Sequence, residues 1–95
     1  MKSAMKTKYV YPATYKYEDN NTISIFFPDI DNIFTNGDSL EECLFNAKEC
    51  LELYIESSLD EGIKLPSPSD YNNIKGNKFL VIADIEKRNA QVNFG

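Results

Sequence analysis

The part of this chain richest in chemically active side chains is the acidic stretch PDIDNIFTNGDSLEE, residues 28–42. Two of its five carboxylates, Asp29 and Asp31, stand two residues apart with an asparagine following. Oxygen ligands at such spacing are typical of calcium loops, which need a further oxygen ligand at position five, glycine at position six and glutamate at position twelve. Counted from Asp29, these positions hold isoleucine, phenylalanine and leucine, so the calcium-loop interpretation fails.

Other catalytic chemistries are restricted because the chain contains no histidine. This removes the commonest general base near neutral pH and the commonest transition-metal ligand. A divalent-metal nuclease stays open as an alternative, because such sites collect carboxylates from several elements and spacing alone does not exclude one. Its ligands would come from Asp29, Asp31, Asp38, Glu42 and Asp84. We predict no catalytic residue, no bound metal and no cofactor.

The distribution of charge points to a protein partner. Residues 18–61 contain twelve acidic residues and one base, Lys48, a net charge of −11 within a chain whose total is −5. Such a block repels nucleic-acid phosphates and attracts a basic protein. The alternative is that the acidic surface only keeps the protein in solution.

The elements that carry these residues begin with a predicted hairpin. Tyrosines alternate along residues 8–17, which predicts a strand with one aromatic face, and Pro12 suggests a sheet edge or a bulge. The tyrosine face is typical of a half-buried strand, with a base-stacking platform as the lesser alternative. Residues 22–27 form the second strand, with Ile23, Ile25 and Phe27 on one face.

A short strand over Ile33–Thr35 and a turn at 36–38, with Gly37 at positive φ, lead into a helix over residues 39–61. Ser39 and Glu42 match a capping box, in which each side chain accepts the other residue's backbone N–H, and Gly62 suits the helix end. Helical spacing places the following residues in one core-facing stripe: Leu40, Cys43, Leu44, Ala47, Cys50, Leu51, Tyr54 and Ile55.

After a loop over residues 65–77, the apolar run KFLVIADI (78–85) predicts a strand buried on both faces. One more strand, around 90–94, remains open. The sequence thus predicts an α+β fold of order β-β-β-α-β, an antiparallel sheet with one long helix on one face.

Two further features concern location and contacts. Cys43 and Cys50 lie two helical turns apart, about 10 Å, too far for a disulfide, whose limit is about 7 Å. Unpaired cysteines, no secretory signal and no apolar run long enough to span a membrane lead us to expect a cytoplasmic protein. Phe45 and Leu53 fall on the outer helix face, where Phe45 suggests a partner contact and leaves a homodimer open.

The order of several short motifs resembles the HicB family of type II antitoxins. The match covers roughly residues 9–85, and residues 86–95 would form a tail or an extra strand of the same single domain, 1–95. Two departures are Asp31 with its following asparagine, where the family often has Pro-Gly, and Phe45 in place of a polar residue. The motifs are Tyr11–Ala13, Phe27–Asp29, Thr35–Cys43, Asn46–Ala47, Leu51–Tyr54 and Pro66–Pro68.

The resemblance implies a partial ribonuclease H-like fold without its catalytic site, and an antitoxin that neutralises HicA, a small basic mRNA-cleaving toxin. Many members add a C-terminal DNA-binding domain. The sequence ends at Gly95 without such a domain, either because it is truncated or because this member lacks one, so we do not expect this chain itself to bind DNA. A stand-alone regulatory domain for another protein is the second alternative. The residues that we predict to contact the partner are Asp29, Asp31, Glu41, Phe45, Glu49 and Glu52.

Overall fold

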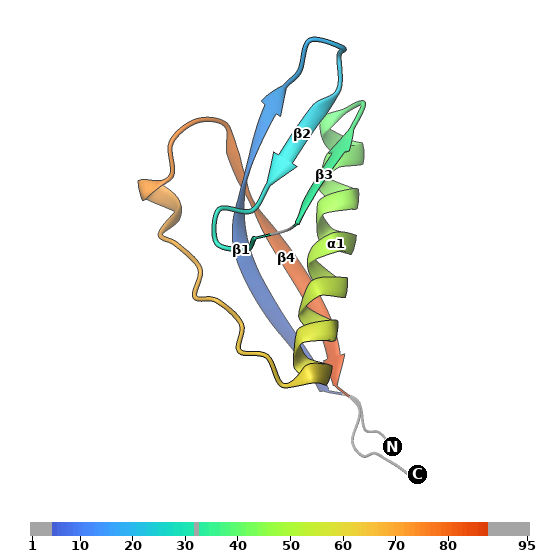
Figure 1. Ribbon diagram of the computed structural model, residues 1–95, viewed down its shortest axis with the longest axis vertical. Helices are drawn as coiled ribbons and strands as arrows, with labels where there is room; N and C mark the ends of the chain where they lie inside the picture. Colours follow the sequence, from blue (N-terminus) through green and yellow to red (C-terminus); the bar gives the residue numbers. More distant parts are fainter. Residues whose placement is uncertain (1–4, 32, 88–95) are drawn as a thin grey trace.

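The computed structural model, which describes residues 5–31 and 33–87, contains a four-stranded sheet and one long helix (Figure 1). The strands are β1 (Met5–Tyr17), β2 (Ile23–Phe26), β3 (Phe34–Gly37) and β4 (Lys78–Lys87), and α1 spans Leu40–Glu61. A 3₁₀ turn, Tyr71–Asn73, interrupts the segment between α1 and β4. The predicted β-β-β-α-β order is therefore confirmed, whereas the predicted strand around 90–94 lies outside the described residues.

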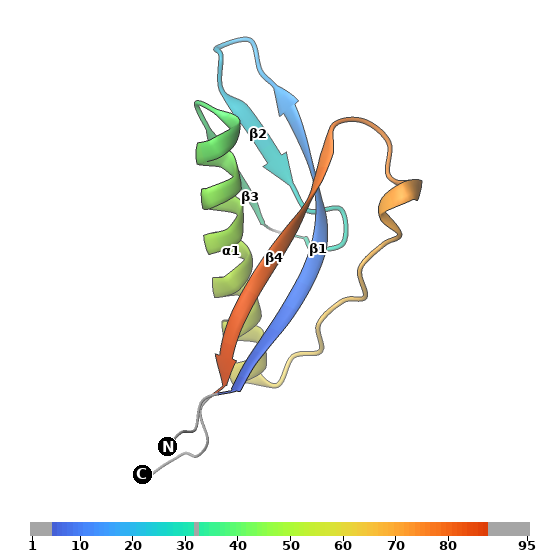
Figure 2. The same ribbon diagram turned by 180° about the vertical axis from the view of Figure 1, so that it is seen from behind.

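The sheet has the order β3-β2-β1-β4, and every neighbouring pair is antiparallel. Figures 1 and 2 show α1 lying along the sheet from β3 to β4, while the segment after α1 returns beside β1. Among the described residues, no helix is both long and apolar enough to cross a membrane.

Although β1 lies between β2 and β4 in the sheet, its pairing with β2 covers only residues 14–17. At Pro12 the strand is therefore paired with β4 alone, which agrees with the predicted edge position. The β1–β4 register runs without a bulge from Met5↔Lys87 to Thr14↔Lys78 and pairs Pro12 with Leu80. In β4 the backbone groups of the even-numbered residues point away from β1. The Ile82 carbonyl and the Asp84 N–H, for example, form hydrogen bonds with side chains of α1. Pro12 therefore occupies a ladder position that needs no N–H.

The core lies between α1 and one face of the sheet. More buried and less buried residues alternate along β2 and along β4 from Leu80, as a period-two pattern predicts. In β1, by contrast, three consecutive residues are buried, Tyr11, Pro12 and Ala13. Because of the alternation in β4, the prediction that this strand is buried on both faces is wrong: Leu80 is 49% exposed and Ile82 is 48% exposed on the outer face. The core residues are Tyr11, Ala13, Ile23, Ile25, Phe27, Ile30, Cys43, Ala47, Leu51, Ile55, Val81, Ala83 and Ile85.

Both ends of α1 are capped, the first by side chains and the last by backbone hydrogen bonds. Ser39 accepts the Glu42 N–H at 3.1 Å, as predicted, but the Glu42 carboxylate accepts the Asp38 N–H at 2.6 Å and not that of Ser39. At the other end Gly62 is left-handed (φ 71°). The Ile63 N–H returns to the Ser58 carbonyl at 2.8 Å, which completes a Schellman motif.

Gly37 differs from its predicted role. It is the last residue of β3, it is buried, and its φ is not among the positive values. A Cβ at this position would lie 2.9 Å from the Cys43 Sγ and 3.1 Å from the Cys43 backbone nitrogen. Glycine is needed here because β3 runs close against the first turn of α1.

The predicted core stripe of α1 is correct at its centre and too wide at its margins. Cys43, Ala47, Leu51 and Ile55 are fully buried, together with Ser58, which the pattern omitted. Leu40 and Leu44, in contrast, are 36% and 44% exposed. Both cysteines are free thiols, and burial raises the pKa of the Cys43 thiol, with smaller contributions from Glu42 and Asp38.

Candidate partner-binding surface

Asp29 links the turn after β2 to the loop that follows α1 through hydrogen bonds. Its carboxylate accepts the backbone N–H of Ser69 at 2.8 Å and also the Ser69 hydroxyl. Close by, the Tyr11 hydroxyl donates to the Pro66 carbonyl at 2.5 Å. Burial raises the pKa of Tyr11, and Tyr54, Asp29 and Tyr9 raise it further. Nothing in the sequence signalled these two long-range bonds, since their partners lie far apart along the chain.

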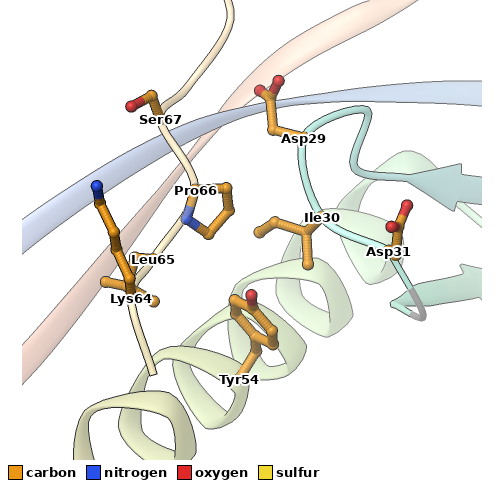
Figure 3. A pocket seen from close by; sticks show the side chains of 8 residues that line it. All are labelled: Asp29, Ile30, Asp31, Tyr54, Lys64, Leu65, Pro66 and Ser67. Atoms are coloured by element: carbon orange, nitrogen blue, oxygen red, sulfur yellow. The ribbon is translucent and has the colours of Figure 1, made fainter. Parts of the chain in front are cut away.

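An open pocket of about 580 Å³ lies between this turn, the middle of α1 and the loop (Figure 3). Asp29 and Asp31 lie on either side of Ile30, and Tyr54 rises from the helix below them. Asp31 is exposed, so its carboxylate is available to a cationic group at the mouth. The lining residues are Asp29, Ile30, Asp31, Tyr54, Lys64, Leu65, Pro66 and Ser67.

The outer face of α1 presents three of the predicted contact residues. Glu41 and Glu49 are exposed, and Phe45 between them is 62% exposed. Residues four apart on a helix are neighbours, so these three form a continuous ridge. The ridge can offer two carboxylates and an aromatic ring to a partner without any rearrangement of the core.

Glu52, in contrast, is engaged within the protein. Its carboxylate accepts the Asp84 backbone N–H at 2.8 Å and pairs with Lys48 at 2.7 Å. Lys48 also donates to the Ile82 carbonyl at 3.1 Å. These two helix side chains thus satisfy backbone groups on the open edge of β4. The i,i+4 spacing of Lys48 and Glu52 was the one signal of this arrangement in the sequence.

Asp84 completes this cluster. It pairs with Lys8 at 2.6 Å and with Lys48 at 3.0 Å. The hydrogen bonds from Lys8 and then Lys48 lower the pKa of Asp84 to about 2. The hydrogen bonds that Lys48 donates to Glu52 and Asp84 in turn raise the pKa of Lys48.

The carboxylates considered for a nuclease do not gather in one place within the described part of the chain. There, no group of three or more potential metal ligands occurs. Asp84 lies with two lysines, Asp29 with Ser69, and Glu42 with the start of α1. The tyrosine face is largely structural: Tyr11 is buried, Tyr15 stacks on Phe79, and Tyr17 is 59% exposed.

Comparison with known proteins identifies the class. The family model of the HicB-like antitoxins of bacterial toxin–antitoxin systems matches residues 10–82. This is well over half of the chain, and the protein belongs to this family. The family expected from the motifs is therefore confirmed.

Two particular relatives extend the comparison. A chain of the solved HicA3 and HicB3 toxin–antitoxin complex is similar, with a TM-score of 0.60 and 28% identity over 81% of this chain and 98% of that one. An uncharacterized 14.9 kDa protein from the rep-hol intergenic region of Haemophilus phage HP1 (strain HP1c1) is 37% identical over 51 residues. That alignment covers 54% of this chain and 37% of the phage protein, so the present chain matches little more than a third of that relative.

Proposed function

We propose that this protein is an antitoxin that binds a small, basic, HicA-like mRNA-cleaving toxin and covers the surface with which the toxin meets RNA. Membership of the HicB-like antitoxin family is the observation that carries this proposal. The similarity to a chain of a HicA3 and HicB3 complex supports a toxin as the partner. The net charge of −11 over residues 18–61 suits a basic protein surface.

The six residues predicted to contact the partner divide into two groups in this proposal. Asp31, Glu41, Phe45 and Glu49 are exposed and would contact the toxin directly. Asp29 and Glu52 would act through position, because Asp29 holds the loop beside the pocket and Glu52 holds α1 against β4. The whole described chain would work as a single domain with a non-enzymatic role in the cytoplasm. A partial ribonuclease H-like character of the β-β-β-α-β fold is part of the proposal.

Co-expression tests this function directly. The reading frame next to the gene is expressed alone and together with this chain, and growth and co-purification are recorded. We expect the neighbouring small basic protein to arrest growth alone, and this chain to restore growth and co-purify with it. A neighbour that is harmless alone and does not bind would refute the antitoxin function and favour a regulatory domain for another protein.

Charge reversal on the ridge tests the surface. We expect Glu41→Lys combined with Glu49→Lys to weaken toxin binding at least about tenfold, because two attractive contacts become repulsive. Asp70→Lys combined with Glu86→Lys is the matched control, since it also reverses two charges and both residues are exposed outside the acidic block. Equal loss in both variants would mean that net charge acts without a defined surface.

A further inference from the structure

A second hollow, which no predicted contact residue lines, opens between the edge strand β3 and α1. It has a volume of about 400 Å³ and is lined by Ile33, Phe34, Cys50, Leu53 and Tyr54. We call it the β3–α1 groove. Leu53 is 66% exposed and Phe34 is 67% exposed, the two largest values among the exposed large hydrophobic residues. Phe34 also stacks on Phe26, with ring centroids 6.3 Å apart.

The groove is continuous with the surface already described. Leu53 follows Glu49 by four residues and therefore extends the ridge by one position. Acidic and apolar side chains alternate along the extended ridge, in the order Glu41, Phe45, Glu49 and Leu53. Tyr54 lines both the groove and the pocket that contains Asp29 and Asp31. An apolar trough thus lies between two sets of carboxylates, on the ridge and on the turn after β2.

Positive charge is turned away from the groove. Lys48 is the single base on α1, and its ammonium is bound to Glu52, Asp84 and the Ile82 carbonyl on the opposite side of the helix. Glu49 directly precedes Cys50 in the sequence, Asp31 lies two residues before Ile33, and both carboxylates are exposed. The charge near the groove is therefore mainly negative. A partner that fits here presents an apolar side chain with Lys or Arg beside it.

We propose that the β3–α1 groove receives an apolar side chain of the basic toxin, while carboxylates of the ridge and of Asp31 hold Lys or Arg residues on either side. This inference rests on the proposed antitoxin function and specifies the contact. The buried apolar side chain anchors the complex. At protein interfaces, truncation of a central side chain that is shielded from water causes the largest loss of binding free energy. The surrounding ion pairs orient the partner and speed its arrival.

Truncation of Leu53 tests the groove. The affinity of the purified chain for the neighbouring basic protein is measured for wild type, Leu53→Ala and Leu80→Ala. Leu80 is the matched control because it is also about half exposed, at 49%, but lies on the outer sheet face. We expect Leu53→Ala to weaken binding about tenfold or more and Leu80→Ala less than about twofold. Thermal unfolding of both variants verifies that they remain folded.

Cys50 supplies a second measurement that needs no substitution. Cys50 lines the groove and is partly exposed, whereas Cys43 is buried. We expect saturating toxin to slow alkylation of Cys50 by iodoacetamide at least about fivefold, because a filled groove excludes the reagent. An unchanged alkylation rate in the saturated complex would overturn the inference.

The outcomes separate this inference from the proposed function. A wild-type chain that binds toxin, with Leu53→Ala binding equally well, would overturn the groove contact and leave the antitoxin function standing. A wild-type chain that binds no basic neighbour would refute both. A homodimer that Leu53→Ala disrupts while toxin affinity is unchanged would assign the groove to a second copy and overturn the inference.

Discussion

At the scale of single residues, Gly37 shows how closely β3 approaches α1. We predict that Gly37→Ala lowers the free energy of unfolding by about 1–3 kcal/mol, because the new methyl would overlap Cys43 and force the helix start outward. Urea denaturation measures the change. Adding Cys43→Ala should recover part of the loss, since it removes the Sγ that would lie 2.9 Å from the added methyl carbon. Full stability of Gly37→Ala would contradict the close approach.

Asp84 gives the protein a pH-dependent contribution to stability. Its pKa is lowered from 3.8 to about 2 in the folded protein by Lys8 and Lys48, so the folded state favours the ionised carboxylate. This contribution is fully present above about pH 4 and is lost as pH falls through about 2. We predict that Asp84→Asn lowers the melting temperature clearly at pH 6 and much less near pH 2, where about half of the carboxylates are protonated in the folded protein. A melting-temperature difference that is the same at both pH values would contradict this role.

At the scale of elements, the cap at Ser39 fixes where α1 begins. We predict that Ser39→Ala lowers the free energy of unfolding by about 1 kcal/mol, because the Glu42 N–H loses its side-chain acceptor. Ser57→Ala is the control, since Ser57 is exposed within the same helix and its hydroxyl makes one long contact, 3.5 Å to Glu61. Chemical denaturation that shows equal stability for both variants would contradict the cap.

Local sequence patterns predicted the helices and strands well, because each pattern depends on interactions between residues that are close together in the sequence. The alternation in residues 22–27, the serine before the helix and the glycine after it all correspond to observed features. Relations between strands could not be predicted in this way. The run 78–85 looked buried on both faces, but its outer face depends on what covers the sheet, and Leu80 and Ile82 remain exposed. The central position of β1 likewise follows from its long pairing with β4.

The candidate site was predictable in outline and not in detail. Exposure of Phe45 and Leu53 followed from the helical wheel, because that pattern is local. The internal role of Glu52 depends on β4, which lies more than thirty residues later, at Asp84. Leu53 was placed on the outer face, but the groove that it borders exists only because β3 packs beside α1.

At the scale of the whole molecule, one acidic region should govern the approach of the partner. We predict that the association rate with the basic toxin falls at least about tenfold between 50 and 500 mM salt, because exposed charges are screened within a Debye length of about 14 to 4 Å over this range. Stopped-flow mixing measures the rate. The dissociation rate should change much less, since the groove contact is apolar. A salt-independent association rate would contradict electrostatic steering.

The central claim is that this chain neutralises its toxin by covering it, and inhibition of RNA cleavage tests the claim most directly. A fixed concentration of the purified HicA-like neighbour, well above the dissociation constant, is mixed with a labelled RNA and titrated with this chain. We predict that cleavage falls linearly and ends when a defined stoichiometric ratio is reached. Undiminished cleavage in the presence of a large excess of folded chain would contradict the account.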